Sequence, residues 1–101
     1  MIDVKYNTKN NKIVDFMIKG HAESISPGEN DLVCAGASSI VFGILNSLDG
    51  EFVKIIVKKD IITIKVLQDD KATQVILKTL IISLKTVENQ YHQYIKVTKE
   101  S

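Results

Sequence analysis

The chain has 101 residues and a formal net charge of +1 at pH 7. This is the length of one domain, and the charge gives no strong field to attract nucleic acid or an anionic membrane. Hydrophobic residues make up 45% of the chain and charged residues 25%, the balance of a globular protein rather than a disordered one. We therefore expect a single domain over residues 1–101, with no nucleic-acid partner and no membrane partner.

Cysteine usage and the N-terminus indicate the compartment. Cys34 is the only cysteine, and the first residues carry no secretory signal. One cysteine cannot form an internal disulfide, and a lone thiol suits a reducing compartment. No stretch reaches the roughly 18 to 20 uninterrupted apolar residues that cross a bilayer. We expect a soluble, cytoplasmic protein in which Cys34 is either buried and inert or takes part in chemistry.

The N-terminal part of the chain predicts a hairpin and a loop. Strands are expected over residues 2–6 and 13–19, joined by a polar, asparagine-rich turn. Residues 21–31 contain serines, proline and glycine, which favour an irregular loop. That loop is long for so small a domain, and long loops are often functional.

A helix follows the loop. Residues 32–48 are small or apolar on nearly every side, which predicts a mostly buried helix. Asp31 is a suitable N-cap, and Asp49-Gly50 would close the helix with a glycine able to take the left-handed conformation.

The C-terminal half repeats the strand-strand-helix pattern and adds a strand, with elements expected over residues 52–58, 61–67, 72–90 and 94–98. Lys59-Asp60 is expected to join the two strands as a hairpin, and Asp69 or Asp70 to cap the second helix. The order strand-strand-helix-strand-strand-helix-strand predicts an α+β fold, a single domain with one mixed sheet packed with two helices.

The segment from Gly20 to Ser38 holds the residues that can carry chemistry. His21 comes just past a strand end, and Cys34 is expected in the first turn of the next helix. Unpaired amides and the helix dipole favour a thiolate there and could hold an oxyanion. If the loop folds back, His21 could take the thiol proton as general base and return one to the leaving amine as general acid. This predicts a cysteine-protease dyad with Cys34 as the nucleophile.

Neighbouring residues could support that dyad. Asp31 could orient the histidine, and Ser38 lies four residues beyond the cysteine, on the same helix face. Residues 35–37 carry little side-chain bulk, which would let another backbone, such as a peptide substrate, approach closely.

Other interpretations stay open when the residues are taken alone. A lone cysteine in an apolar helix is most often a small buried hydrophobe, and His92 at the end of the last helix is best explained as structural. Two histidines and one cysteine so far apart make a poor zinc site, so no metal and no cofactor is expected. The three tyrosines, Tyr6, Tyr91 and Tyr94, could stack on bases, but we expect no basic patch around them.

The same segment also carries the pattern of a known family, in Gly20-His21-Ala22, Gly28, Asp31 and the Cys34-Ala35 pair followed by Ser38. With these residues, and in its length and order of elements, the chain resembles the ribosomal-processing cysteine protease family, Prp. The resemblance implies that Cys34 and His21 are the catalytic dyad, that Asp31 and Ser38 have supporting roles, and that a mobile loop containing Pro27 and Gly28 lies over the site.

The resemblance further implies a substrate and an assembly. The substrate would be the short N-terminal extension of a ribosomal large-subunit protein, number twenty-seven, removed after paired aromatic residues before ribosome assembly. The protein would be a homodimer. The alternative hypothesis is a non-catalytic ribosome-assembly or protein-binding module that uses the same groove, and a third is a redox or acyl-transfer role for Cys34.

Overall fold

The structure is a computed structural model that describes residues 1–20 and 29–101, with side chains described at 1–20 and 32–101. These residues form five strands and two helices: β1 (Ile2–Lys9), β2 (Lys12–Lys19), α1 (Glu29–Leu45), β3 (Val53–Lys58), β4 (Ile61–Val66), α2 (Lys71–Gln90) and β5 (Ile95–Lys99). The predicted order of elements and the α+β class are confirmed.

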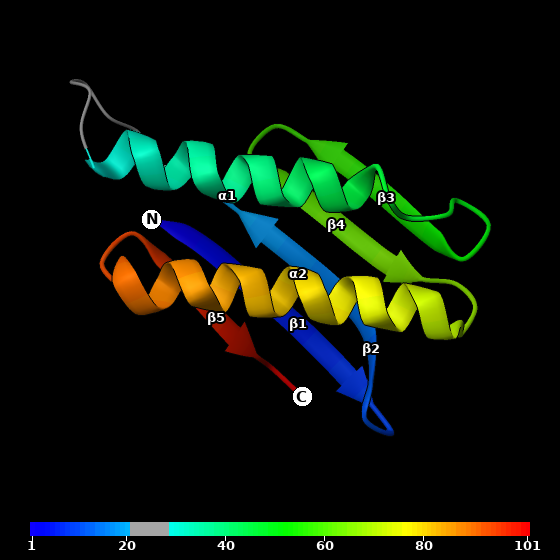
Figure 1. The fold of residues 1–101 in the computed structure, drawn as a ribbon. Helices are drawn as coiled ribbons and strands as arrows, with labels where there is room; N and C mark the ends of the chain where they lie inside the picture. Colours follow the sequence, from blue (N-terminus) through cyan, green and yellow to red (C-terminus); the bar gives the residue numbers. More distant parts are fainter. Residues whose placement is uncertain (21–28) are drawn as a thin grey trace.

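The five strands form one mixed sheet in the order β3-β4-β2-β1-β5. Strand β5 runs parallel to β1, and the other neighbours are antiparallel. Both helices lie side by side on the same face of the sheet (Figure 1). The fold therefore has two layers, and the other face of the sheet is not covered by any described element.

Two tight turns set the register of the hairpins. Asn10 and Asn11, between β1 and β2, have φ values of 54° and 63°, and Asp60, between β3 and β4, has a φ of 67°. Asparagine and aspartate tolerate this left-handed region better than most residues. Both hairpins are confirmed.

The core lies between the sheet and the two helices. Alternate strand residues such as Val4, Phe16 and Ile64 are buried against the helices, because successive side chains of a strand point to opposite faces of the sheet. Helix α2 contributes the predicted stripe of Leu77, Leu80, Ile81 and Leu84. Its N-cap is Asp70, whose carboxylate accepts a hydrogen bond from the amide of Thr73 at 3.1 Å.

Helix α1 differs from the prediction in its bounds. It begins at Glu29 and ends at Leu45, three residues earlier than expected at each end. Asp31 is therefore the third helical residue and not the N-cap, and the predicted loop ends before it. Gly50 does not take the left-handed conformation, since Gly20 is the one glycine with positive φ among the described residues.

Helix α1 is also less buried than predicted. Among the described side chains of α1, one stripe, at Val33, Ala37 and Val41, is buried against the sheet. Leu32 and Phe42 on the other side are 70% and 50% exposed. A helix in a two-layer fold has one face to bury, whatever its composition. Among the described residues, no helix is long and apolar enough to span a membrane.

Candidate active site

Gly20, at the end of β2, is fixed by the fold. Its amide donates a hydrogen bond to the carbonyl of Asp60 at 2.8 Å, and its φ is +84°. A Cβ at this position would lie 2.6 Å from the carbonyl oxygen of Met1. Glycine is the residue that fits both the dihedral angle and the close approach. The fold thus fixes the position of Gly20 next to the end of β2.

Cys34 is held by α1 and is partly buried. Ala37, Ser38 and Val41 lie three, four and seven residues further along, so all four share one side of the helix. Ala37 is 1% exposed and faces the sheet, where its small side chain allows α1 to approach closely. The cysteine thus lies at the edge between the core and the surface.

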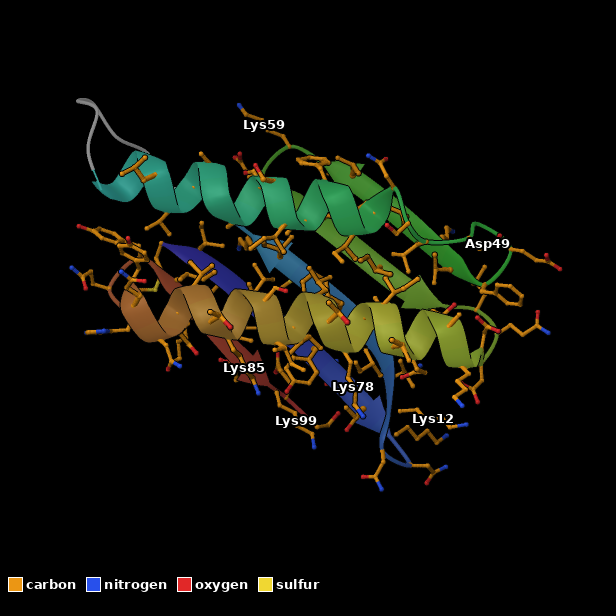
Figure 2. All side chains as sticks on the ribbon, in the orientation of Figure 1. Lys12, Asp49, Lys59, Lys78, Lys85 and Lys99 are labelled. Atoms are coloured by element: carbon orange, nitrogen blue, oxygen red, sulfur yellow. The ribbon has the colours of Figure 1, made fainter. Side chains whose placement is uncertain are left out.

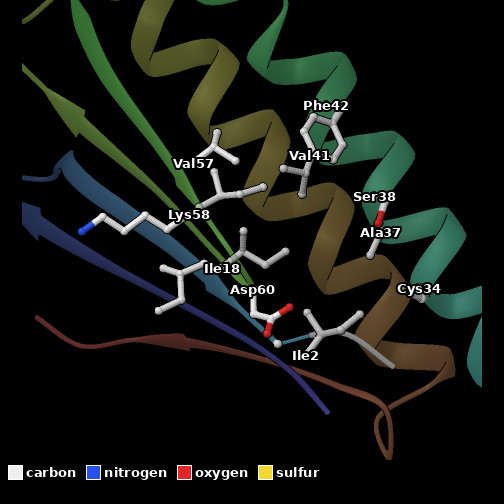
Figure 3. A pocket seen from close by; sticks show the side chains of 13 residues that line it. Ile2, Ile18, Cys34, Ala37, Ser38, Val41, Phe42, Val57, Lys58 and Asp60 are labelled. Carbon is white, nitrogen blue, oxygen red and sulfur yellow. The ribbon is translucent and has the colours of Figure 1, made fainter. Parts of the chain in front are cut away.

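A cavity of about 250 Å³ opens beside the cysteine (Figure 3). One wall is the side of α1 that carries Cys34, and the other is formed by strand ends and the turn between β3 and β4. The lining is mostly apolar and consists of Ile2, Ile18, Gly20, Cys34, Ala37, Ser38, Val41, Phe42, Val57, Lys58, Asp60, Ile61 and Ile62. A thiol facing such a cavity is placed to meet an apolar ligand that enters from solvent.

The structure corrects the position of the cysteine within its helix. Cys34 is the sixth residue of α1, so the prediction that it lies in the first turn is wrong. The amides without intrahelical acceptors are the first four, and the dipole effect falls off within the first turn. The helix start is therefore a weaker source of thiolate and oxyanion stabilisation than the sequence suggested.

The predicted site residues are only partly brought together. Gly20 and Ser38 line the same cavity as Cys34. Ala35 lies on the exposed side of α1, outside the lining, and Asp31 lies in α1 with its side chain outside the described set. The remaining predicted residues fall outside the described residues: His21, Ala22, Pro27 and Gly28.

Sequence reasoning missed the far wall of the cavity. Asp60 was predicted only as a turn residue, and Phe42 only as part of a buried helix. Figure 3 shows the Asp60 side chain facing the cavity opposite α1. Asp60 is 40 residues from Gly20 in the sequence, and the link between them exists because β4 pairs with β2. No local sequence motif predicts that pairing.

Comparison with known proteins identifies the family. The family model described as "Cysteine protease Prp" matches residues 1–96. The chain belongs to the cysteine protease Prp family. The family activity makes this chain a cysteine protease and confirms the resemblance that the sequence predicted.

Individual relatives agree with the family assignment. The ribosomal processing cysteine protease Prp of Staphylococcus aureus (strain Mu50 / ATCC 700699) is 32% identical over 106 residues, covering 95% of this chain and 94% of that protein. A crystal structure of the S. aureus family member with a substrate peptide has a TM-score of 0.87 at 28% identity, covering 99% of this chain and 100% of that one. A second, with a covalently linked product peptide, has a TM-score of 0.86 at 30% identity and the same coverage.

Proposed function

We propose that this protein is a cytoplasmic cysteine endopeptidase that removes the short N-terminal extension of a ribosomal large-subunit protein, number twenty-seven, before ribosome assembly. The observation that carries the proposal is the position of Cys34. It is the only cysteine of a chain in a cysteine protease family, and it lines an apolar cavity open to solvent. The S. aureus relative is a ribosomal processing cysteine protease, which supports this class of substrate.

The proposed mechanism is covalent. His21 takes the proton of the Cys34 thiol, and Sγ attacks the scissile carbonyl to form a tetrahedral intermediate. The C–N bond breaks, the amine leaves with the proton from His21, and a thioester remains. Water then attacks the thioester, gives its proton to His21 and releases the carboxylic acid and the free thiol. The covalently linked product peptide in the S. aureus structure supports a route of this kind.

The cavity favours an apolar segment of the substrate. Phe42 and Val57 are half or more exposed although both are large and apolar, and both line the cavity. Covering them with apolar substrate side chains would stabilise the complex by about 25 cal/mol per Å² of buried surface. This agrees with the paired aromatic residues expected before the cleavage site.

We assign Asp60 the role of a positioning residue that acts through His21. The Asp60 carbonyl oxygen accepts a hydrogen bond from the amide of Gly20. His21 follows Gly20 in the sequence, and consecutive Cα atoms of a chain are about 3.8 Å apart. The Asp60 carboxylate faces the cavity that Cys34 also lines. A carboxylate placed there can hold the imidazole in the tautomer and orientation that general-base catalysis needs. Ser38 and Asp31 stay in the proposal as supporting residues.

We also propose that the protein forms a homodimer, as the family resemblance implies. Light scattering at micromolar concentration should then give about twice the 11.3 kDa mass of the chain. A mass near that of one chain at all concentrations up to about 100 μM would contradict the dimer, without bearing on the protease activity.

The experiment that tests the function uses the purified chain and the full-length precursor of the ribosomal protein. Intact mass spectrometry should show loss of an N-terminal peptide with the wild type and with Ser39→Ala, a surface variant of α1 outside the cavity. Cys34→Ala should leave the precursor intact. Binding without shortening by the wild type would favour the alternative, a ribosome-assembly or protein-binding module. Shortening by Cys34→Ala would exclude the proposed nucleophile.

A further inference from the structure

A row of lysines lies on the side of α2 that faces away from α1. Lys71, Lys78 and Lys85 are seven residues apart, so their side chains leave the helix on the same side and extend over about 21 Å of its length. Lys99, the last residue of β5, and Lys12, the first of β2, flank the same side. Figure 2 shows Lys12, Lys78, Lys85 and Lys99 gathered there, far from Lys59.

The lysines line two adjoining cavities. One, of about 280 Å³, is lined by Tyr6, Thr8, Asn11, Ile13, Lys78, Ile81, Ile82, Lys85 and Lys99. The other, of about 220 Å³, is lined by Asn11, Lys12, Asp69, Lys71, Gln74 and Lys78. The two share Asn11 and Lys78 and so are neighbours, and together we call them the lysine groove. It has no lining residue in common with the Cys34 cavity.

The lysine groove carries an excess of positive charge. Its lining holds five lysines and one carboxylate, a net charge of +4, whereas the whole chain has +1. Like charges that lie close together repel one another in the free protein, so binding of an anion among them relieves the repulsion and is favourable. Lys85 lies over the ring of Tyr6, with Nζ 5.8 Å from the centroid, which holds its ammonium at the groove.

The carboxylates in and near the groove already have partners, and one of these partners, Lys12, is itself a groove lysine. Asp69 pairs with Lys12, and Glu100 pairs with Lys5 on the opposite face of the sheet. Glu88 accepts a hydrogen bond from the backbone amide of Val97. Among the described residues, the ion pairs leave four groove lysines, Lys71, Lys78, Lys85 and Lys99, without a carboxylate partner. Four ammonium groups are therefore available to a ligand.

From this geometry we propose that the lysine groove binds the phosphate backbone of single-stranded RNA. A linear row of cations suits a linear polyanion, and all 13 basic residues of the chain are lysines, whose compact ammonium binds phosphate as a point charge. The chain has no arginine, so bidentate contacts to a carboxylate or a phosphate are excluded, and the groove would bind its ligand by charge alone. The apolar stripe of α2 is buried on the sheet, and its large exposed apolar residues, Val75 and Ile82, are two isolated side chains rather than a wide apolar face that could insert into a bilayer.

The binding should be weak and independent of sequence. Tyr6 is 7% exposed, so its ring is no platform for stacking bases, and affinity would come from phosphate contacts. The expectation that the protein has no nucleic-acid partner rested on the net charge of +1 and on the apparent lack of a basic patch around the tyrosines. The groove lysines lie between positions 12 and 99, and the fold brings them together.

The test measures binding of a fluorescent 12-nucleotide oligouridine by anisotropy between 25 and 200 mM NaCl. The groove variant replaces Lys78, Lys85 and Lys99 with Gln. The control replaces Lys54, Lys65 and Lys96, which are exposed on the open face of the sheet. Each variant loses three charges, so the net charge falls from +1 to −2 in both. Peptide cleavage should stay within twofold of wild type in both, because these lysines lie outside the Cys34 cavity.

We expect the groove variant to lose at least about tenfold in affinity at 50 mM NaCl. The magnitude of the slope of log K against log salt should decrease by about 2, because each of the three lost phosphate contacts contributes about 0.7. The control should lose less than threefold, and Lys→Arg replacements at the three groove positions should retain binding. Equal losses in both variants would overturn the proposal in favour of net charge alone. Tighter binding of a polyglutamate peptide or of phosphatidylglycerol vesicles than of the RNA would also overturn it.

Discussion

Replacing Gly20 with alanine tests whether the fold fixes the point at which the chain leaves β2. Gly20 has a φ of +84°, and a Cβ there would lie 2.6 Å from the Met1 carbonyl oxygen. The left-handed conformation costs an L-residue about 1–2 kcal/mol, and forcing an extra methyl into a filled space costs about 1–3 kcal/mol. Alanine recovers only about 0.4–1 kcal/mol by restricting the unfolded chain. The variant should therefore lose about 1–4 kcal/mol of stability.

Thermal and urea unfolding measure this loss. For a domain of this length, about 1 kcal/mol corresponds to about 4–8 °C in Tm, so the Tm should fall by at least about 4 °C. The matched control is Gly43→Ala, inside α1, where a Cβ meets nothing within 4 Å. That variant should gain about 0.5–1 kcal/mol from helix propensity. A Gly20→Ala protein as stable as wild type would refute the argument for a fixed Gly20.

Three further substitutions separate stability from catalysis. Asp70→Ala removes the N-cap of α2 and should lose about 0.5–2 kcal/mol in urea unfolding, whereas Asp69→Ala, which breaks only a surface ion pair, should lose less than about 1 kcal/mol. Glycine tolerates the φ of 67° at position 60, so Asp60→Gly should fold normally but lower kcat at least about tenfold with KM unchanged. Asp60→Asn keeps an acceptor oxygen and should retain most of the wild-type kcat. An unchanged kcat in Asp60→Gly would remove Asp60 from the mechanism. Phe42→Ala should raise KM several-fold with little loss of stability, since Phe42 is 50% exposed and lines the cavity. Leu32→Ala, which is exposed outside the cavity, should change neither.

The parts of the fold that follow from local patterns were predictable. The alternation in the strands and the helical spacing of Leu77, Leu80 and Leu84 define which face is buried, and the turn at Asn10-Asn11 fits asparagine's tolerance of positive φ. The start of α1 was not predictable to the residue. Several candidate cap residues occur between Ser24 and Asp31, so local preferences do not select one of them.

The parts that depend on sheet order were not predictable. Pairing of β4 with β2 brings Asp60 to Gly20, and thus a carboxylate to the cavity wall, but no sequence period encodes which strands become neighbours. The lysine groove has the same origin, since β1, β2, α2 and β5 each contribute to it. Family resemblance supplied the pairing of Cys34 with His21, whereas the residues alone favoured an inert, buried cysteine.

The most direct test of the central claim is the rate at which iodoacetamide alkylates Cys34 at pH 7, measured by intact mass. If His21 takes the thiol proton, the wild type should react at least about tenfold faster than an unstructured cysteine peptide, because the thiolate is the reactive form. His21→Ala should lose that advantage, and His92→Ala, which changes the other histidine, should keep it. Equal rates in the wild type and His21→Ala would contradict the proposed dyad.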